Sequence, residues 1–140
     1  MSYGVAAALQ SAVYRRLSED GALAALVGTD IYDALPTGAL PPLYVVLGAE
    51  DVRDASDKTG AGAWHQFTVT VVTQSAGFAT AKAAASAVSD ALVNASLALD
   101  RGMLTSLNFH KAKAARIGTG AVRQINLTFR ARVADDTSPN

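Results

Sequence analysis

The hydrophobic and polar positions of residues 64–73 alternate with the two-residue period of a β-strand. Apolar side chains fall on one face and polar side chains on the other: Phe67, Val69 and Val71 against Gln66, Thr68 and Thr70. This period is typical of a strand with one buried face, and the β-branched residues suit a pleated surface. The segment therefore predicts a strand around which the rest of the chain is organised.

A helix is predicted directly after this strand. Residues 74–77 interrupt the alternation, and apolar side chains then recur at steps of three and four: Phe78, Ala81, Ala85, Val88, Leu92 and Ala95. Such spacing places them on one face of a helix. Because most of them are alanine, we expect this helix to lie close against the buried face of the strand.

Similar patterns predict the remaining elements. The segments with helical periodicity are residues 3–19 and one further turn at 22–27. The segments with strand character are residues 43–47, 103–115 and 122–133, together with a possible short strand at 31–35. Residues 49–63 are polar and rich in turn-forming residues, so we interpret them as a long, mobile connection. Gly118-Thr119-Gly120 predicts a hairpin turn.

The predicted fold is α+β, with a mostly antiparallel four-stranded sheet and two main helices packed on one face. At 140 residues the chain is long enough for one well-packed core. We expect a single domain over residues 1–134 and a flexible tail over residues 135–140. The predicted core positions come from the inward faces of both element types: Val5, Leu9, Val13, Leu17, Phe67, Val69, Val71, Val88, Leu92, Ile125, Leu127 and Phe129.

Charge is unevenly distributed although the net charge is zero. Residues 1–100 hold five basic and ten acidic groups, whereas residues 101–140 hold seven basic and two acidic groups. This asymmetry indicates either nucleic-acid binding, or an acidic side that meets the basic side of a neighbour, or no more than two halves that intermix in the fold. Only 17% of residues are charged, against about a quarter in typical domains, which favours a surface partly covered by partners.

The candidate chemical groups do not combine into a recognisable site. His65 and His110 lack the three or four ligands of a metal centre, and we interpret both as histidines on the sheet surface. Glu50 and Asp51 are adjacent carboxylates, more typical of a solvated loop than of a catalytic pair. The chain contains no cysteine, and no stretch reaches the roughly 20 apolar residues of a membrane span. We therefore expect no enzyme, no cofactor, no metal and no membrane partner.

Six basic side chains could form one basic face of the sheet. They are Lys111, Lys113, Arg116, Arg123, Arg130 and Arg132. A nonspecific nucleic-acid surface is one interpretation, although a stacking platform would need interleaved aromatic residues that are absent here. A solvated or subunit-facing surface is the other.

A series of segments, in this order, resembles the phage tail-completion, or tail-terminator, family. The series comprises Arg15-Arg16-Leu17, Ala22–Gly28, Ile31–Pro36, Pro42–Gly48, His65–Val69 and Leu127–Arg130. It covers nearly the whole chain and is most similar to members from long non-contractile tails and phage-like gene transfer agents. One departure is Leu43, which stands between Pro42 and Tyr44 where the family usually has proline directly before tyrosine.

The resemblance implies a structural virion protein without cofactor. Such a subunit forms a homo-hexameric ring at the head-proximal end of the tail tube, terminates tube polymerisation and joins the tail to head-completion, or stopper, proteins. DNA passes through the lumen without sequence-specific contact. The implied location is the tail of a virion or phage-like particle, assembled in the bacterial cytoplasm. The alternative is a dimeric α+β ligand- or nucleic-acid-binding module, which a concave apolar pocket would favour.

For a ring-forming subunit, the polar connection and the last strand are the candidate protein–protein interface. The residues are Glu50, Asp51, Arg53, Asp54, Asp57, Lys58, Arg130 and Arg132. Ring closure requires two different patches on each subunit, and the charge asymmetry is one way to provide them.

Overall fold

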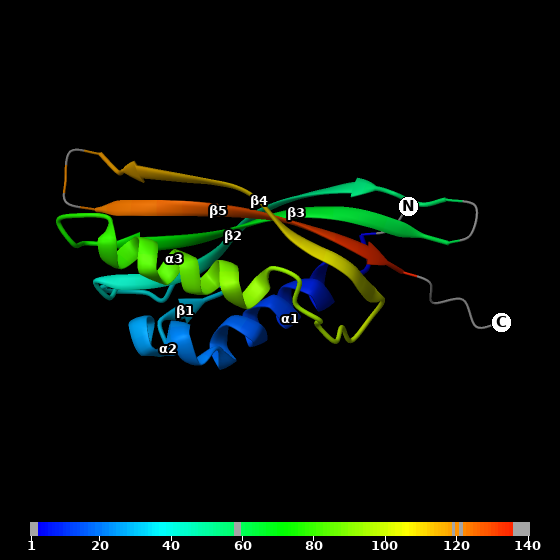
Figure 1. Cartoon of the computed structure of the whole chain (residues 1–140), viewed down its shortest axis with the longest axis horizontal. Coiled ribbons are helices and arrows are strands. Elements are labelled where there is room, and N and C mark those ends of the chain that lie inside the picture. The colour runs from blue at the N-terminus through cyan, green and yellow to red at the C-terminus, as the bar shows by residue number, and fades with distance from the viewer. Residues whose placement is uncertain (1–2, 58–59, 119, 121, 136–140) are drawn as a thin grey trace.

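The computed structural model describes residues 3–57, 60–118, 120 and 122–135, and consists of one sheet with helices on one side (Figure 1). The elements are α1 (Ala6–Glu19), α2 (Gly21–Val27), β1 (Ile31–Tyr32), β2 (Leu43–Asp54), β3 (Gly62–Thr73), α3 (Ala79–Leu92), β4 (Met103–Arg116) and β5 (Arg123–Ala134). The strand order is β1-β2-β3-β5-β4. The short β1 runs parallel to β2, and the other neighbours are antiparallel.

The predicted α+β class is confirmed, but the predicted strand number is wrong. The described sheet has five strands rather than four and is mixed, because the possible short strand at 31–35 forms at Ile31–Tyr32 and pairs parallel to β2. The two main helices are α1 and α3, and the further turn predicted at 22–27 is a short third helix. Asp20 separates α1 from α2: its extended backbone ends the first helix, and its carboxylate accepts a hydrogen bond from the Leu23 amide at 2.9 Å, as a helix N-cap does.

The core lies between the three helices and the inner face of the sheet, the face that they cover. All twelve predicted core residues are buried, so the periodicities identified the inward faces correctly. Four residues of the predicted face of α3, Ala81, Ala85, Val88 and Leu92, are buried, as are Ala84, Ala87 and Ala91 beside them. Phe78 and Ala95 lie just outside the helix and are half-buried. The expected packing on the sheet is confirmed, since α3 contacts β3 and β5. Small side chains at this surface let the helix lie close to the strands.

The prediction of a long mobile connection at residues 49–63 is wrong. β2 continues to Asp54 and pairs with β3 in regular register from Glu50↔Phe67 to Asp54↔Ala63. A bulge lies between Leu47 and Glu50, and beyond it polar side chains occupy both faces of the strand, so the sequence shows no alternation there. The hairpin formed by β2 and β3 extends beyond the helical layer (Figure 1).

The C-terminal end of β5 is fixed by an ion pair. Asp135, predicted to begin the tail, is buried and accepts hydrogen bonds from Arg101 Nε at 3.0 Å and Nη2 at 2.8 Å. Gly102 next to Arg101 has a φ of +74°, and a Cβ there would lie 2.7 Å from the Ala134 carbonyl oxygen. This close approach requires glycine. Residues 136–140 of the predicted tail lie outside the described residues.

Candidate functional site

The predicted interface residues divide between the two faces of the sheet. Residues directly opposite one another on neighbouring strands share a face. Asp51 is opposite Gln66 and Arg53 is opposite Trp64, so both lie on the face away from the helices, here called the open face. Adjacent residues in a strand point to opposite faces, so Glu50 and Asp54 lie on the inner face. These residues are neighbours in the sequence, but the pleat of the strand places them on opposite faces of the sheet.

A tryptophan and three arginines gather on the open face near the end of the β2–β3 hairpin. The Arg130 guanidinium carbon lies 4.6 Å from the centroid of the Trp64 ring and that of Arg132 lies 5.7 Å from it. Arg53, paired across from Trp64, has its Nε 3.4 Å from Asp51 Oδ2. Guanidinium groups at these distances are attracted by the face of the indole ring. The arrangement places three guanidinium groups and the Asp51 carboxylate around the exposed side of the Trp64 ring on the open face.

On the inner face, Glu50 connects the hairpin to the N-terminal segment. Its carboxylate accepts a hydrogen bond from the Tyr3 hydroxyl. This hydrogen bond, reinforced by the negative charge, raises the pKa of Tyr3. The other carboxylate oxygen lies 3.6 Å from Nδ1 of His65. Glu50 is therefore held by contacts within the subunit, on the face of the sheet opposite to Asp51.

The prediction that His65 lies at the sheet surface is wrong. Its side chain is fully buried, and neither ring nitrogen has a hydrogen-bond partner within the part of the chain that the structure describes. His65 has the same parity as Phe67 and Val69, so the alternation that located the core also placed this histidine inside. That signal was present in the sequence. His110, by contrast, is exposed on β4.

The end of the β2–β3 hairpin is held by local hydrogen bonds. Asp54 accepts hydrogen bonds from the backbone and the hydroxyl of Ser56, and the hydroxyl is the main reason that the pKa of Asp54 is lowered. The carboxylate of Asp57 accepts a hydrogen bond from the Gly60 amide at 3.1 Å. Such contacts are typical of turns with aspartate and serine. Lys58, predicted for the interface, lies outside the described residues.

Four of the six basic residues expected on one sheet face lie together on the open face. Lys111 and Lys113 pair opposite Thr128 and Asn126, and Arg130 and Arg132 continue this face of β5. The other two differ: Arg123 donates from Nη1 to the Ser75 carbonyl oxygen at 3.0 Å, near the Phe78 ring, and Arg116 pairs opposite it.

A bulge between Phe109 and Lys111 explains the position of the two lysines. Regular alternation would place them on the same face as Phe109. The extra residue reverses the facing of the second half of β4. Lys111 and Lys113 then line a shallow polar hollow on the open face with Thr68, Thr70, Asn126 and Thr128.

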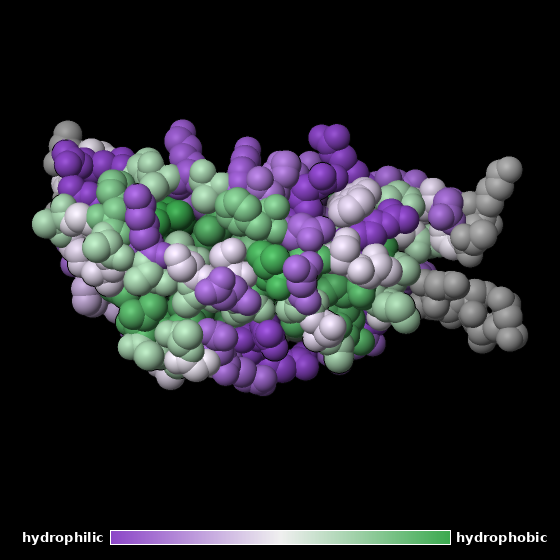
Figure 2. Space-filling model, in the orientation of Figure 1, coloured by the Kyte–Doolittle hydropathy of each residue, from purple (hydrophilic) through white to green (hydrophobic). Residues whose placement is uncertain are grey.

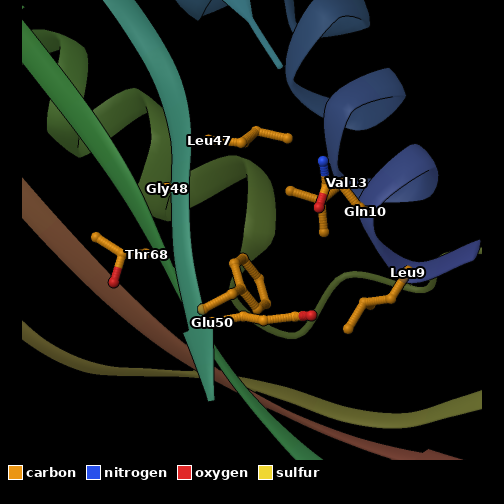
Figure 3. Close-up of a pocket in the computed structure, with 8 residues that line it drawn as sticks. Leu9, Gln10, Val13, Leu47, Gly48, Glu50 and Thr68 are labelled. Carbon is orange, nitrogen blue, oxygen red and sulfur yellow. The ribbon is translucent and has the colours of Figure 1, made fainter. Parts of the chain in front are cut away.

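A small cavity lies between α1 and β2 (Figure 3). Leu9, Gln10 and Val13 line it from the helix, and Leu47, Gly48 and Glu50 line it from the strand. Its volume is about 20 Å³, room for about one water molecule. Ligand pockets have volumes of about 300–1,000 Å³, so this cavity is too small for a cofactor or substrate.

The described residues contain no group of three or more histidine and carboxylate side chains placed to hold a metal ion. Glu50 and Asp51, considered as a carboxylate pair, point to opposite faces and do not form one. None of the helices in the described part of the chain has the length and hydropathy that a membrane span requires.

The fold and its surfaces together are typical of a structural α+β subunit: a tightly packed core, an open charged sheet face and long exposed hairpins. The comparisons with known proteins identify the family. A sequence model of the family described as "Tail completion protein gp17" matches residues 11–134, and the chain belongs to this family. The predicted tail-completion membership is thereby confirmed.

One solved structure shows the relationship in three dimensions. A chain from the structure of the virion of a native gene transfer agent particle is 62% identical in sequence and superposes with a TM-score of 0.91. The match covers 95% of this chain and 99% of that chain. No curated protein sequence matches.

Proposed function

We propose that the protein is a structural, non-catalytic component of the tail of a phage-like gene transfer agent particle. The observation that carries this proposal is the 62% identity, over nearly the full length of both chains, to a chain of a gene transfer agent virion. The TM-score of 0.91 shows that the fold is shared, and the tail-completion family supplies the class of role. The protein is therefore a virion protein, at the tail.

Within that role, the subunit forms a homo-hexameric ring at the head-proximal end of the tail tube. The ring stops tube polymerisation and provides the surface for the head-completion, or stopper, protein, while DNA passes through its lumen without sequence-specific contact. Support comes from the opposite charge of the two edges of the sheet, acidic beside β1 and β2 and basic along β4, since a closed ring needs unlike patches that meet. The alternative, a dimeric ligand- or nucleic-acid-binding module, has less support than the match to a virion chain over nearly the full length of both chains.

The direct test is reconstruction of intact particles that carry a tagged copy of this chain. We expect density for it as one ring between tail tube and head. Particles that lack the chain should contain tubes of irregular length or tails not joined to heads. Normal tails and normal joining in the absence of the chain would contradict the proposal.

The end of the β2–β3 hairpin is the first interface to test. Replacing residues 56–61 by Asn-Gly keeps the backbone hydrogen bond from the Ala55 amide to the Gly62 carbonyl, and Asn-Gly forms a two-residue hairpin turn. The change removes Asp57 and Lys58, and also Ser56 and Ala61, which hydrogen-bond to Asp54 and to the Asp135 amide. Asp54 stays opposite Ala63 in the strand pairing. We expect the melting temperature of the isolated subunit to fall by only a few degrees, while ring formation or tail joining is lost. Normal assembly would show that the hairpin end is a spacer.

A further inference from the structure

The two edges of the sheet carry opposite charge. Residues 30–54, which include β1 and β2 at one edge, hold five acidic groups and one arginine, a net charge of −4. β4, at the other edge, holds three basic groups and no acidic group, a net charge of +3. The acidic groups are Asp30, Asp33, Glu50, Asp51 and Asp54, and the basic groups are Lys111, Lys113 and Arg116.

The basic edge is also uncovered and partly apolar. β4 has 14 residues, and in the described chain no strand pairs with its outer side. Proteins usually shorten or cover such edges, because the free amide and carbonyl groups invite a further strand. The Phe109 side chain is 46% exposed there. The length and exposure of this edge indicate that a partner covers it.

A groove runs between β4 and α3, beside this edge. Its floor is formed by apolar residues, Phe109, Ala112, Ala114, Ile125 and Leu127, and its wall by Lys82, Ala85, Ser86 and Ser89 of α3. Its volume is about 320 Å³. Figure 2 shows apolar surface on this side of the molecule between α3 and β4. The groove offers apolar contact next to basic side chains.

The acidic edge presents a complementary surface. Tyr3 and Tyr14 of the N-terminal region are 58% and 37% exposed, and they line a hollow with Asp33 and Glu50. Hydrogen bonds from Tyr3 to Glu50 and from Gln10 to Asp33 tie α1 to this edge of the sheet. Tyrosine is enriched at protein interfaces because it combines an apolar ring with a polar hydroxyl. The charge of this edge is therefore opposite to that of the β4 edge, and its exposed tyrosines are suited to contact the apolar groove beside β4.

We propose that the acidic edge of one subunit, with Tyr3 and Tyr14, docks on the basic edge and the α3–β4 groove of a second copy of this chain. The inference rests on the proposed ring function and names its subunit interface. Both edges belong to every subunit, and each is complementary to the other rather than to itself. Contacts of this heterologous kind propagate head to tail, and they form a closed ring when the rotation between neighbours closes.

Site-specific crosslinking in assembled particles tests this contact, and the absence of cysteine from the chain leaves the background clean. Ala112→Cys is placed on the exposed part of β4, and Ser11→Cys on the acidic side of α1. With a flexible bis-maleimide, we expect the double variant to give a ladder of covalent multimers. Each single variant should give almost none, because in a head-to-tail contact like positions do not meet.

Charge reversal tests the energetics. Lys111→Glu/Lys113→Glu and Asp33→Lys/Asp51→Lys should each reduce incorporation into particles by about tenfold or more, because like charges then face each other. The variant with all four changes should recover most of the loss. The control Asp90→Lys, an exposed reversal on α3 outside the groove, should assemble normally. Unchanged melting temperatures would show that the reversals act on assembly and not on folding.

The outcomes separate this inference from the function on which it rests. A single-cysteine variant that crosslinks as efficiently as the double variant would indicate a symmetric contact and overturn the inference. Particles that contain the chain but yield no ladder, or that assemble normally with either reversed pair, would also overturn it and leave the proposed function intact. Absence of the wild-type chain from particles would overturn both.

Discussion

Replacing Phe129 by alanine tests the packing between β5 and its neighbours at a ring with no exposed surface. The Phe129 ring lies 5.7 Å from that of Phe67, nearly parallel to it at 26°, and 6.0 Å from that of Phe109, edge-to-face at 78°. Burying about 200 Å² of aromatic surface is worth about 5 kcal/mol as an upper bound. Alanine retains part of this, and measured costs for such changes are about 3–5 kcal/mol.

The assay is urea unfolding of the isolated subunit. With a slope of about 2 kcal/mol per molar, a loss of 3–5 kcal/mol lowers the midpoint by about 2 M. Domains have total stabilities of about 5–15 kcal/mol, so the variant should still fold in buffer. The slope should remain unchanged if only stability is affected.

Phe109→Ala is the matched control. It removes the edge-to-face partner of the same ring, but its own side chain is about half exposed. We expect a cost of about 1–2 kcal/mol, part from lost burial and part from the lost ring pair. A cost below about 1 kcal/mol for Phe129→Ala, or equal costs for the two variants, would refute the assigned inward face of β5.

Three further predictions concern stability; the first two are measured by urea unfolding and the third by thermal unfolding. His65→Leu should leave stability unchanged or raise it by about 1 kcal/mol, because it removes two buried ring nitrogens without hydrogen-bond partners in the described structure; a loss above about 2 kcal/mol would show that the imidazole is satisfied. Gly102→Ala should cost about 2–4 kcal/mol and Gly118→Ala only about 1–2 kcal/mol, because both glycines have a positive φ but only at Gly102 would a Cβ meet other atoms. Equal costs would show that the clash of the Cβ at Gly102 does not contribute. Arg101→Met should lower the melting temperature by several degrees because it leaves the buried carboxylate of Asp135 without the Arg101 guanidinium, and a shift of less than about 2 °C would contradict this.

The sequence predicted the core well because its periodicities are long and regular. In β3 and β5, alternate positions are apolar over most of the strand, so Val69, Val71, Leu127 and Phe129 could only share one face. The helices follow the same logic with a period of 3.6. The family resemblance could also be recognised from the sequence, because it depended on the order of several short segments and not on a single motif.

The surfaces were harder to predict, for physical reasons. In β2 after Gly48, polar side chains occupy both faces, so no period marks the strand, and only pairing with the more regular β3 reveals it. The candidate interface was read as one loop, whereas the pleat places Glu50 and Asp51 on opposite faces. The two oppositely charged edges emerge only when the strand order is known, because β2 and β4 are distant in sequence and lie on opposite sides of the sheet.

The bulge in β4 gives this strand one residue more than its pairing with β5 uses. Phe109 is opposite Phe129 and Lys111 is opposite Thr128, so His110 is the extra residue. Deleting His110 would leave Lys111 opposite Thr128 and make the pairing regular, and Lys111 and Lys113 would stay on the open face. In β5, which pairs with β3 without a bulge, deleting one residue would instead move every later side chain to the other face. A three-nucleotide deletion in the coding sequence is therefore expected to be far less damaging at His110 than within β5.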